Sequence, residues 1–232
     1  IYEGQRSTDP NNRVFLLTRS GYAGSQRYAA TIWSGDIGAR WEDMKTQITA
    51  GVNFSMSGLP YWTMDIGGFG VEKRFEQPAA ADQQEWQELQ TRWFQFGTFV
   101  PLFRSHGQFP FREVYNISKP GSPAYESMLY YNRLRYRLLP YTYSLAGMAY
   151  HRQYTIMRGL VMDFPNDEHS LTVGHEYMYG PSFLINPVCE YNKREQLVYL
   201  PAGQGWYDLY TGIYQEGGQE VTAVAPYERM PV

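Results

Sequence analysis

Residues 31–69 read TIWSGDIGARWEDMKTQITAGVNFSMSGLPYWTMDIGGF, a stretch that predicts two strands with a helix between them. The first predicted strand is Thr31-Ile32-Trp33, whose β-branched and aromatic residues are typical of strands, and a Ser-Gly pair ends it just before Asp36. The second predicted strand is 59–64, which leads directly into Asp65. Each predicted strand is therefore followed by an acidic residue.

A helix is predicted between the two strands because Trp41, Met44 and Ile48 recur at spacings of three and four residues, with Gly51 as its expected end. Strands joined by a helical crossover are parallel, and the C-terminal ends of parallel strands meet at one edge of the sheet, where loops carry ligand-binding groups. An aspartate after a strand can equally be a helix N-cap or a turn former, so position alone leaves the role of both acids open.

Aromatic residues stand beside both acids. Trp33 precedes Asp36, and Trp62 and Phe69 lie on either side of Asp65. A sugar ring offers C–H faces that pack on aromatic rings, and its hydroxyl groups can donate hydrogen bonds to carboxylates. This combination favours a carbohydrate site over a purely structural role for the two acids.

Several groups of residues occur in an order and spacing that are typical of one enzyme family. They are Arg19-Ser20 with Gly24 and Arg27-Tyr28, Trp33-Ser34-Gly35-Asp36 with the Trp41 helix, Gly58-Leu59-Pro60, Met64-Asp65-Ile66-Gly67-Gly68-Phe69, and Phe103-Arg104-Ser105-His106-Gly107. Together they resemble glycoside hydrolase family 31, which contains α-glucosidases, α-xylosidases and α-glucan lyases on a (β/α)8 barrel. The resemblance continues to the end of the chain.

The resemblance implies a retaining glycosidase, in which one carboxylate is the nucleophile and a second is first the general acid and then the general base. By the family pattern, Asp36 is this catalytic acid/base. The resemblance assigns substrate binding to Arg19, Trp33, Asp65, Phe69 and His106. Spacing alone would instead suggest Asp36 and Asp65 as the catalytic pair.

The family nucleophile is an aspartate in a Trp-x-Asp-x-x-Glu-like motif on an earlier strand, and no such motif occurs in these 232 residues. The chain begins at Ile1 in a segment that resembles the middle of the family's barrel, and it ends at Val232, where family members continue. We therefore expect a fragment of a longer enzyme that is catalytically incompetent by itself. Its expected partners are an oligosaccharide substrate, the remainder of the parent chain and, through its exposed barrel edges, a second copy of the fragment.

The sequences of 22–36 and 61–69 are similar to those of bacterial α-xylosidases acting on xyloglucan-type oligosaccharides, and α-glucosidases rank second in this similarity. The resemblance also makes a periplasmic or extracellular location plausible for the parent protein. Two other classes stay open. A noncatalytic sugar-binding module would use the same aromatic and acidic residues, and a purely structural half-barrel would bind no sugar.

The resemblance implies an α/β fold in two parts: the C-terminal half of a (β/α)8 TIM barrel over residues 1–155, and the start of an antiparallel β-sandwich over 156–232. Local patterns agree with this division. They predict a doubly buried strand at 14–18, a helix with Asp82 as N-cap and Gly97 as end, a buried strand or extended segment at 99–103, and a helix opened by Ser122-Pro123 and broken at Pro140. They then predict a strand-like connection at 158–165 and short strands separated by Gly and Pro turns.

Composition excludes several other functions. A formal net charge of -3 and the lack of a Lys/Arg run argue against nucleic acid, and no stretch is apolar for long enough to cross a bilayer. The single cysteine, Cys189, rules out an internal disulfide. Neither the glycines of 21–24 nor the acidic loop 166–169 has the spacing of a phosphate or metal site, so we expect no cofactor and no metal.

Overall fold

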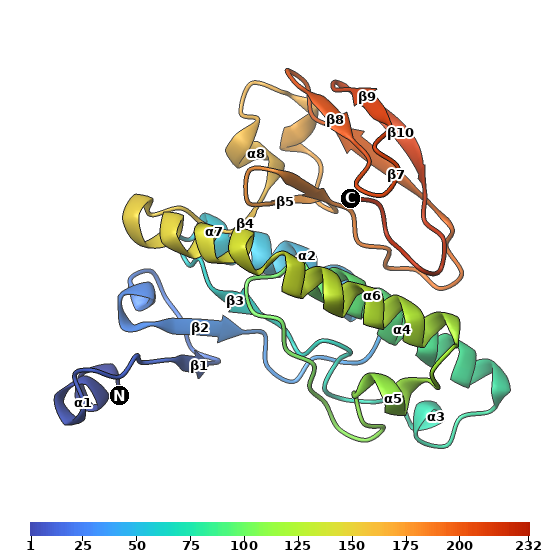
Figure 1. Cartoon of the computed structure of the whole chain (residues 1–232), viewed down its shortest axis with the longest axis horizontal. Coiled ribbons are helices and arrows are strands. Elements are labelled where there is room, and N and C mark those ends of the chain that lie inside the picture. The colour runs from blue at the N-terminus through green and yellow to red at the C-terminus, as the bar shows by residue number, and fades with distance from the viewer.

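The computed structural model describes residues 1–232 and shows two differently built regions along the chain (Figure 1). Helices and short parallel strands occupy roughly the first two thirds, and antiparallel strands follow. In Figure 1 the antiparallel strands, in orange and red, stand above the long helices, and the blue parallel strands lie below them.

A three-stranded parallel sheet forms from β1 (Leu16–Thr18), β2 (Ala30–Trp33) and β3 (Trp62–Thr63), in that order. The helix α2 (Trp41–Met56) connects β2 to β3, as the sequence predicts. A single 3-10 turn, η1 (Ser25–Tyr28), lies in the shorter connection from β1 to β2. Because β2 and β3 are parallel, the residues that follow them lie at the same edge of the sheet.

The prediction that α2 ends at Gly51 is wrong. Gly51 lies inside the helix and is buried. A Cβ atom at this position would overlap the sulfur of Met157, so glycine allows the helix to pack closely on β4. The helix ends at Met56 instead. Gly58, at φ +77°, follows in the left-handed conformation that commonly terminates helices.

Six further helices belong to this region. None of the helices combines the length and the apolar character that a bilayer crossing needs. The six are α1 (Tyr2–Thr8), α3 (Lys73–Glu76), α4 (Ala80–Gly97), α5 (Val114–Ile117), α6 (Pro123–Arg137) and α7 (Leu139–Arg152). Ser122 caps α6 by accepting a hydrogen bond from the Tyr125 amide, and Pro140 lies in the first turn of α7. The predicted cap and the predicted break at the proline are therefore confirmed.

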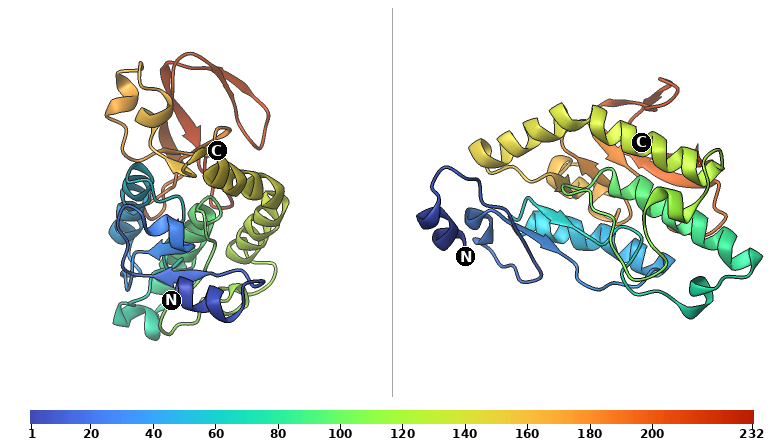
Figure 2. Two further views of the ribbon diagram at one scale, coloured as in Figure 1. Left: turned by 90° about the vertical axis from the view of Figure 1, so that its left-hand side faces the viewer. Right: turned by 60° about the horizontal axis from the view of Figure 1, so that its bottom comes forward.

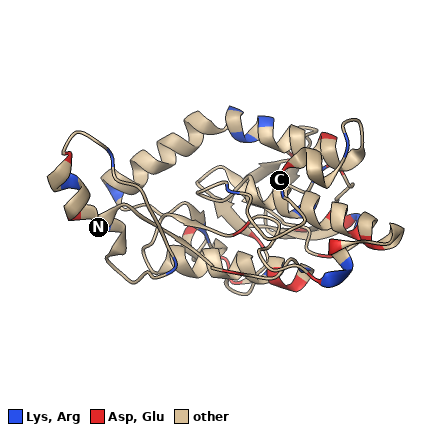
Figure 3. Cartoon of the chain, turned by 90° about the horizontal axis from the view of Figure 1, so that it is seen from below, with Lys and Arg blue, Asp and Glu red and all other residues tan.

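The start of α4 differs from the prediction, because Ala79 rather than Asp82 precedes the helix. Asp82 lies in its first turn, where a negative charge is favourable near the N-terminal end of the helix dipole. Its carboxylate joins a cluster in which Arg74 also pairs with Glu72 at 2.7 Å and with Glu85 at 2.6 Å. Figure 3 shows the resulting mixture of basic and acidic segments at this end of the molecule.

The C-terminal region is built from antiparallel pairs: β4, β5 and β6 form one sheet, β7 pairs with β10, and β8 pairs with β9. The strands are β4 (Met157–Arg158), β5 (Tyr177–Tyr179), β6 (Phe183–Ile185), β7 (Glu195–Leu200), β8 (Gly205–Tyr207), β9 (Tyr214–Glu216) and β10 (Gln219–Val224). Their short lengths and tight turns confirm the antiparallel prediction.

Three predicted segments differ from the structure. The connection 158–165 is not strand-like beyond Arg158, because it turns into the short helix α8 (Leu160–Asp163), and the 3-10 turn η2 (His169–Leu171) follows. The segment 99–103 is buried only in part and forms no strand. The expected doubly buried strand at 14–18 lies at the edge of its sheet, which leaves β1 only half-buried.

One large hydrophobic core of 31 buried residues joins the two regions, and a smaller core of six residues includes three residues of β7. The left view of Figure 2 shows the parallel strands and the antiparallel strands on opposite sides of the molecule, with long helices between them. Arg92 of α4 links the regions directly, since its guanidinium donates to the carbonyl oxygens of Ala225 at 2.8 Å and Lys193 at 3.1 Å. The C-terminal strands thus pack on the scaffold that carries the parallel sheet.

The turn after β3 gives a test of this packing. Gly68 has φ +75°, and a Cβ atom on it would overlap the backbone of Ala39. Gly58 has a similar φ of +77°, but a Cβ atom on it would have no other atom within 4 Å. Both Gly→Ala changes force an unfavourable left-handed backbone, but only Gly68→Ala adds a backbone clash. We expect Gly68→Ala to lower the free energy of unfolding by about 2–5 kcal/mol and Gly58→Ala by about 1–2 kcal/mol in urea unfolding. Equal losses would show that the turn does not press on Ala39.

Candidate active site

Asp36 lies just after β2, in a loop that leaves its carboxylate half-exposed. Arg19, just after β1, forms an ion pair with Asp36 through its Nη2 atom, and its guanidinium is also half-exposed. Gly35 precedes Asp36 with φ +78°, a left-handed backbone conformation that favours glycine, and a Cβ atom there would only touch Arg19, at 3.5 Å from its Nε atom. The ends of two neighbouring strands thus present an accessible carboxylate beside a guanidinium.

Asp65 lies just after β3, and it is fully buried. Its Oδ1 atom accepts a hydrogen bond from Nη1 of Arg104, whereas its Oδ2 atom has no hydrogen-bond partner in the protein. Burial raises the pKa of the Asp65 carboxyl above its ordinary value, and the neighbouring Arg104 opposes this shift. A buried acceptor without a partner costs free energy, so a donor that reached the Oδ2 atom would be stabilising.

Phe69 and His106 face each other across two loops that the backbone ties together. Their ring centroids are 5.6 Å apart, with the planes tilted by 32°. The amide of Gln108 donates to the carbonyl oxygen of Phe69 at 3.0 Å, and Ile66 forms a parallel bridge with Ser105. The segment that carries His106 therefore runs beside the one that carries Asp65.

Trp33, the last residue of β2, lies between the two acidic centres. The guanidinium of Arg19 stands 5.4 Å from its ring centroid, and that of Arg104 stands 6.0 Å from it. Each guanidinium also pairs with one of the two acids, Asp36 or Asp65. The arginine partners of both carboxylates therefore lie close to the same indole ring.

All six residues predicted for the site lie in one neighbourhood, at the edge formed by the C-terminal ends of the parallel strands. The sequence reasoning missed two arginines. Arg104 was visible inside the motif that ends at His106, and the rule that a buried acid needs a partner could have identified it. Arg112 gave no sequence signal, because its hydrogen-bond partners are backbone carbonyl groups.

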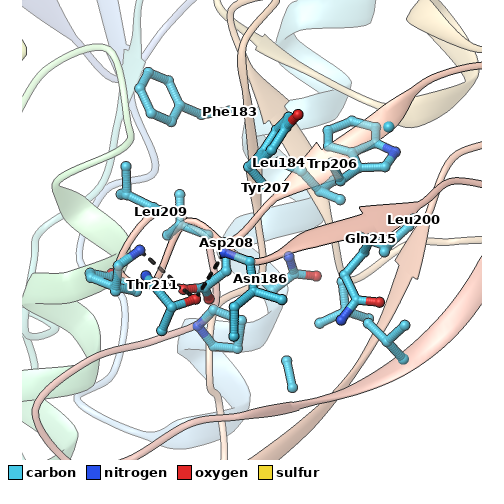
Figure 4. Close-up of a pocket in the computed structure, with 18 of the residues that line it drawn as sticks. Phe183, Leu184, Asn186, Leu200, Trp206, Tyr207, Asp208, Leu209, Thr211 and Gln215 are labelled. Carbon is cyan, nitrogen blue, oxygen red and sulfur yellow. Dashed lines mark hydrogen bonds between the residues drawn. The ribbon is translucent and has the colours of Figure 1, made fainter.

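A cavity of about 670 Å³ lies elsewhere, among the antiparallel strands (Figure 4). Its walls are largely apolar and include Trp206, Leu184 and Leu200. Its acidic residue is Asp208, whose carboxylate stabilises a turn. The Oδ1 atom accepts hydrogen bonds from the amide and from the hydroxyl of Thr211, both at 2.7 Å. This cavity lacks the convergent charged groups that distinguish the edge at Asp36.

The structure contains no group of three or more His, Cys, Asp or Glu residues placed to hold a metal ion. In the acidic loop, the Asp167 carboxylate accepts hydrogen bonds from the hydroxyl of Tyr199 at 2.7 Å and from the amide of Ala202 at 2.9 Å. It fastens the loop to the neighbouring strand. Burial raises the pKa of the Cys189 thiol to about 12, which keeps this thiol protonated and unreactive at neutral pH.

Parallel strands joined by a helical crossover, with polar side chains gathered just past their C-terminal ends, are typical of α/β proteins, both barrels and open sheets. Residues 1–145 match the family described as the glycosyl hydrolases family 31 TIM-barrel domain, and residues 153–232 match the glycosyl hydrolase family 31 C-terminal domain. The chain belongs to glycoside hydrolase family 31, which confirms the resemblance seen in its motifs.

Two curated relatives show how similar the chain is to characterised proteins. It is 44% identical to an α-xylosidase of Saccharolobus solfataricus over its whole length, which is 30% of that protein. It is 34% identical to α-glucosidase 2 of Bacillus thermoamyloliquefaciens, again over its whole length, which is 27% of that protein. The chain thus spans less than a third of these relatives.

Two solved structures share its fold. The family 31 α-xylosidase of Xanthomonas citri superposes with a TM-score of 0.97 at 58% identity, over 99% of this chain and 25% of that one. A family 31 α-xylosidase from a soil metagenome, complexed with xylose, gives a TM-score of 0.89 at 35% identity, over 99% of this chain and 35% of that one.

The raised pKa of Asp65 predicts a pH-dependent stability. Because the ionised form is disfavoured in the folded state, the stabilising contribution of Asp65 is fully present below its unfolded pKa and is lost as the pH rises through its folded pKa. Asp65→Asn has no such ionisation. In urea unfolding at several pH values from 7 down to 4, we expect the wild type to gain stability relative to Asp65→Asn as the pH falls. The opposite trend would mean that pairing with Arg104 outweighs burial.

Proposed function

We propose that this chain is part of a retaining α-glycosidase that removes non-reducing-end α-xylosyl residues from xyloglucan-type oligosaccharides. One observation carries the proposal. A half-exposed carboxylate, Asp36, stands at the same sheet edge as a buried carboxylate, Asp65, that keeps one oxygen atom without a partner. The first has the access that proton transfer to a substrate requires, and the second has an acceptor for a substrate hydroxyl.

The proposed roles follow from these environments. Asp36 protonates the departing glycosidic oxygen and later activates the water that releases the sugar, as the acid/base of a retaining enzyme does. Its ion pair with Arg19 holds the carboxylate in place while leaving it in reach of the substrate. The nucleophile is supplied from outside these 232 residues, because the chain contains no counterpart of the family's nucleophile motif.

Substrate binding is assigned to the residues around Asp65. Its Oδ2 atom accepts from a sugar hydroxyl, and the Phe69 and His106 rings, 5.6 Å apart, line the pocket that receives the sugar. The imidazole can both donate to and accept from hydroxyl groups. Trp33 offers an aromatic face, and Arg19 completes the pocket with donors that can reach either the sugar or Asp36.

The α-xylosyl preference is proposed from the similar proteins. A curated relative that is 44% identical to the chain is an α-xylosidase, two solved family 31 α-xylosidases share its fold, and one of these is complexed with xylose. The second candidate is an α-glucosidase, which the similarity to the Bacillus protein supports. The two activities differ in whether the pocket admits the hydroxymethyl group of glucose.

The proposal includes a finer description of the fold. Residues 1–155 form the C-terminal half of a (β/α)8 barrel, and residues 156–232 begin a β-sandwich. The exposure of the edge strand β1 supports the first part, because further strands of a closed barrel would cover that edge; Phe15, directly before β1, is 61% exposed. The apolar cavity between antiparallel pairs supports the second, since additional strands would fill it.

Asp36→Asn in the full-length protein tests the acid/base role. Asparagine can still accept the hydrogen bond of Arg19, but it cannot donate the proton that a sugar leaving group needs. We expect kcat/KM for an α-xylosyl-glucose disaccharide to fall by about 10²–10⁴-fold. The loss for p-nitrophenyl α-D-xyloside should be smaller, because nitrophenolate leaves with little protonation.

Asp82→Asn is the matched control, since Asp82 also pairs with an arginine but lies on α4 away from the site. The Asp82→Asn enzyme should keep the wild-type kcat/KM on both the disaccharide and p-nitrophenyl α-D-xyloside. An Asp36→Asn enzyme with wild-type kcat/KM on the disaccharide would contradict the acid/base assignment. If the full-length wild type binds xylose yet cleaves neither substrate, the chain belongs instead to a noncatalytic sugar-binding protein.

The missing nucleophile gives a separate prediction. The isolated 232-residue chain should release no nitrophenol from p-nitrophenyl α-D-xyloside or α-D-glucoside, while the full-length protein should hydrolyse the xyloside faster. Turnover by the isolated chain that Asp65→Asn abolishes would contradict this and favour Asp36 and Asp65 as the catalytic pair. A faster rate on the glucoside would select the α-glucosidase alternative.

A further inference from the structure

Arg112 is a buried arginine whose guanidinium binds backbone carbonyl groups of two different loops. Its Nη2 atom donates to the carbonyl oxygen of Gly68 at 2.7 Å. Its Nη1 atom donates to the carbonyl oxygen of Gln108 at 2.8 Å and also to that of Pro110. The first acceptor belongs to the turn between Asp65 and Phe69, and the other two belong to the loop that follows His106.

The surroundings of this guanidinium are shaped to hold it. A Cβ atom on Gly107 would lie 2.5 Å from the Nη2 atom of Arg112, and one on Gly67 would lie 3.1 Å from its Nε atom. The guanidinium also lies 4.8 Å from the ring centroid of Trp86 on α4. Glycines on both loops thus leave room for a planar cation that is packed against the helix beneath them.

No carboxylate forms an ion pair with Arg112, which is 5% exposed. Burial lowers its pKa to about 10, so the group keeps its charge at neutral pH. A buried charge requires hydrogen bonds, and here only backbone oxygen atoms of the two loops provide them. Moving either loop would therefore leave a buried cation with fewer partners, which makes the relative position of the loops rigid.

We propose that Arg112 is a positioning residue for the sugar pocket: it fixes the turn 67–68 against the loop 106–110, so that Asp65, Phe69 and His106 keep their relative places. The proposal rests on the proposed function insofar as the pocket receives a sugar. Misplacement of binding groups by about 1 Å can cost on the order of 100-fold in rate, so a residue that touches no substrate can still control catalysis.

A purely structural role is the competing explanation, and Arg92 provides the control for it. Arg92 is also buried and also donates to backbone carbonyl oxygens, those of Lys193, Ala225 and Arg229, but it joins α4 to the C-terminal strands. Arg112→Met and Arg92→Met should both destabilise the protein. Only Arg112→Met should loosen the sugar pocket.

The experiment compares the two variants in the full-length protein by hydrogen exchange and by kinetics. The amides of Phe69 and Gln108, which donate to Ile37 and Phe69 respectively, report on the two loops. After correction for global stability, we expect both amides to exchange at least tenfold faster in Arg112→Met than in Arg92→Met. We also expect kcat/KM for p-nitrophenyl α-D-xyloside to fall by about 10–100-fold in Arg112→Met, through both kcat and KM, and to stay within about twofold in Arg92→Met.

Arg112→Lys is the second variant, and it keeps the test decisive if Arg112→Met does not fold. Lysine retains the charge but cannot bridge carbonyl groups with a planar fork, so it should show the same local exchange pattern to a smaller extent. Equal exchange in the Arg112 and Arg92 variants, or unchanged kinetics in both Arg112 variants, would overturn the proposal. Faster local exchange in a protein whose wild type cleaves no glycoside would instead reject the glycosidase function and leave the loop-positioning role.

Discussion

The pairing of buried Asp65 with Arg104 is the constraint on which the rest of the site depends. A carboxylate removed from water needs partners for its oxygen atoms, and the protein supplies one for Oδ1 but none for Oδ2. Parallel pairing of β2 with β3 sets Asp65 at the same edge as Asp36. The two acids therefore share one location but have opposite environments, one buried and one half-exposed.

This difference in environment explains how one sheet edge can carry two kinds of chemistry. Arg19 pairs with Asp36 at the surface, and Arg104 pairs with Asp65 in the interior, where one carboxylate oxygen keeps no partner; the proposed function assigns proton transfer to the first and sugar binding to the second. The Trp33 ring lies close to both arginines, within 5.4 Å of the Arg19 guanidinium and 6.0 Å of the Arg104 guanidinium. The loops that bring Phe69 and His106 together are in turn fastened beneath by glycines and a buried cation.

Periodicity and turn residues predicted the strand-helix-strand unit and the placement of both acids, because these depend on local patterns. The end of α2 was missed because a tertiary contact with Met157 retains Gly51 inside the helix. The exposure of β1 depends on which strand lies beside it, and the sequence of 14–18 does not contain that information. Arg112 could not be identified because its partners are carbonyl oxygens, which every residue possesses.

The most direct test of the central claim is a crystal structure of the full-length protein, as its Asp36→Asn variant, with an α-xylosyl oligosaccharide bound. The account predicts a sugar hydroxyl within hydrogen-bond distance of Oδ2 of Asp65, and residue 36 beside the glycosidic oxygen. A sugar bound elsewhere, such as in the cavity lined by Trp206, or an Asp65 whose Oδ2 atom is satisfied by a protein group, would contradict it.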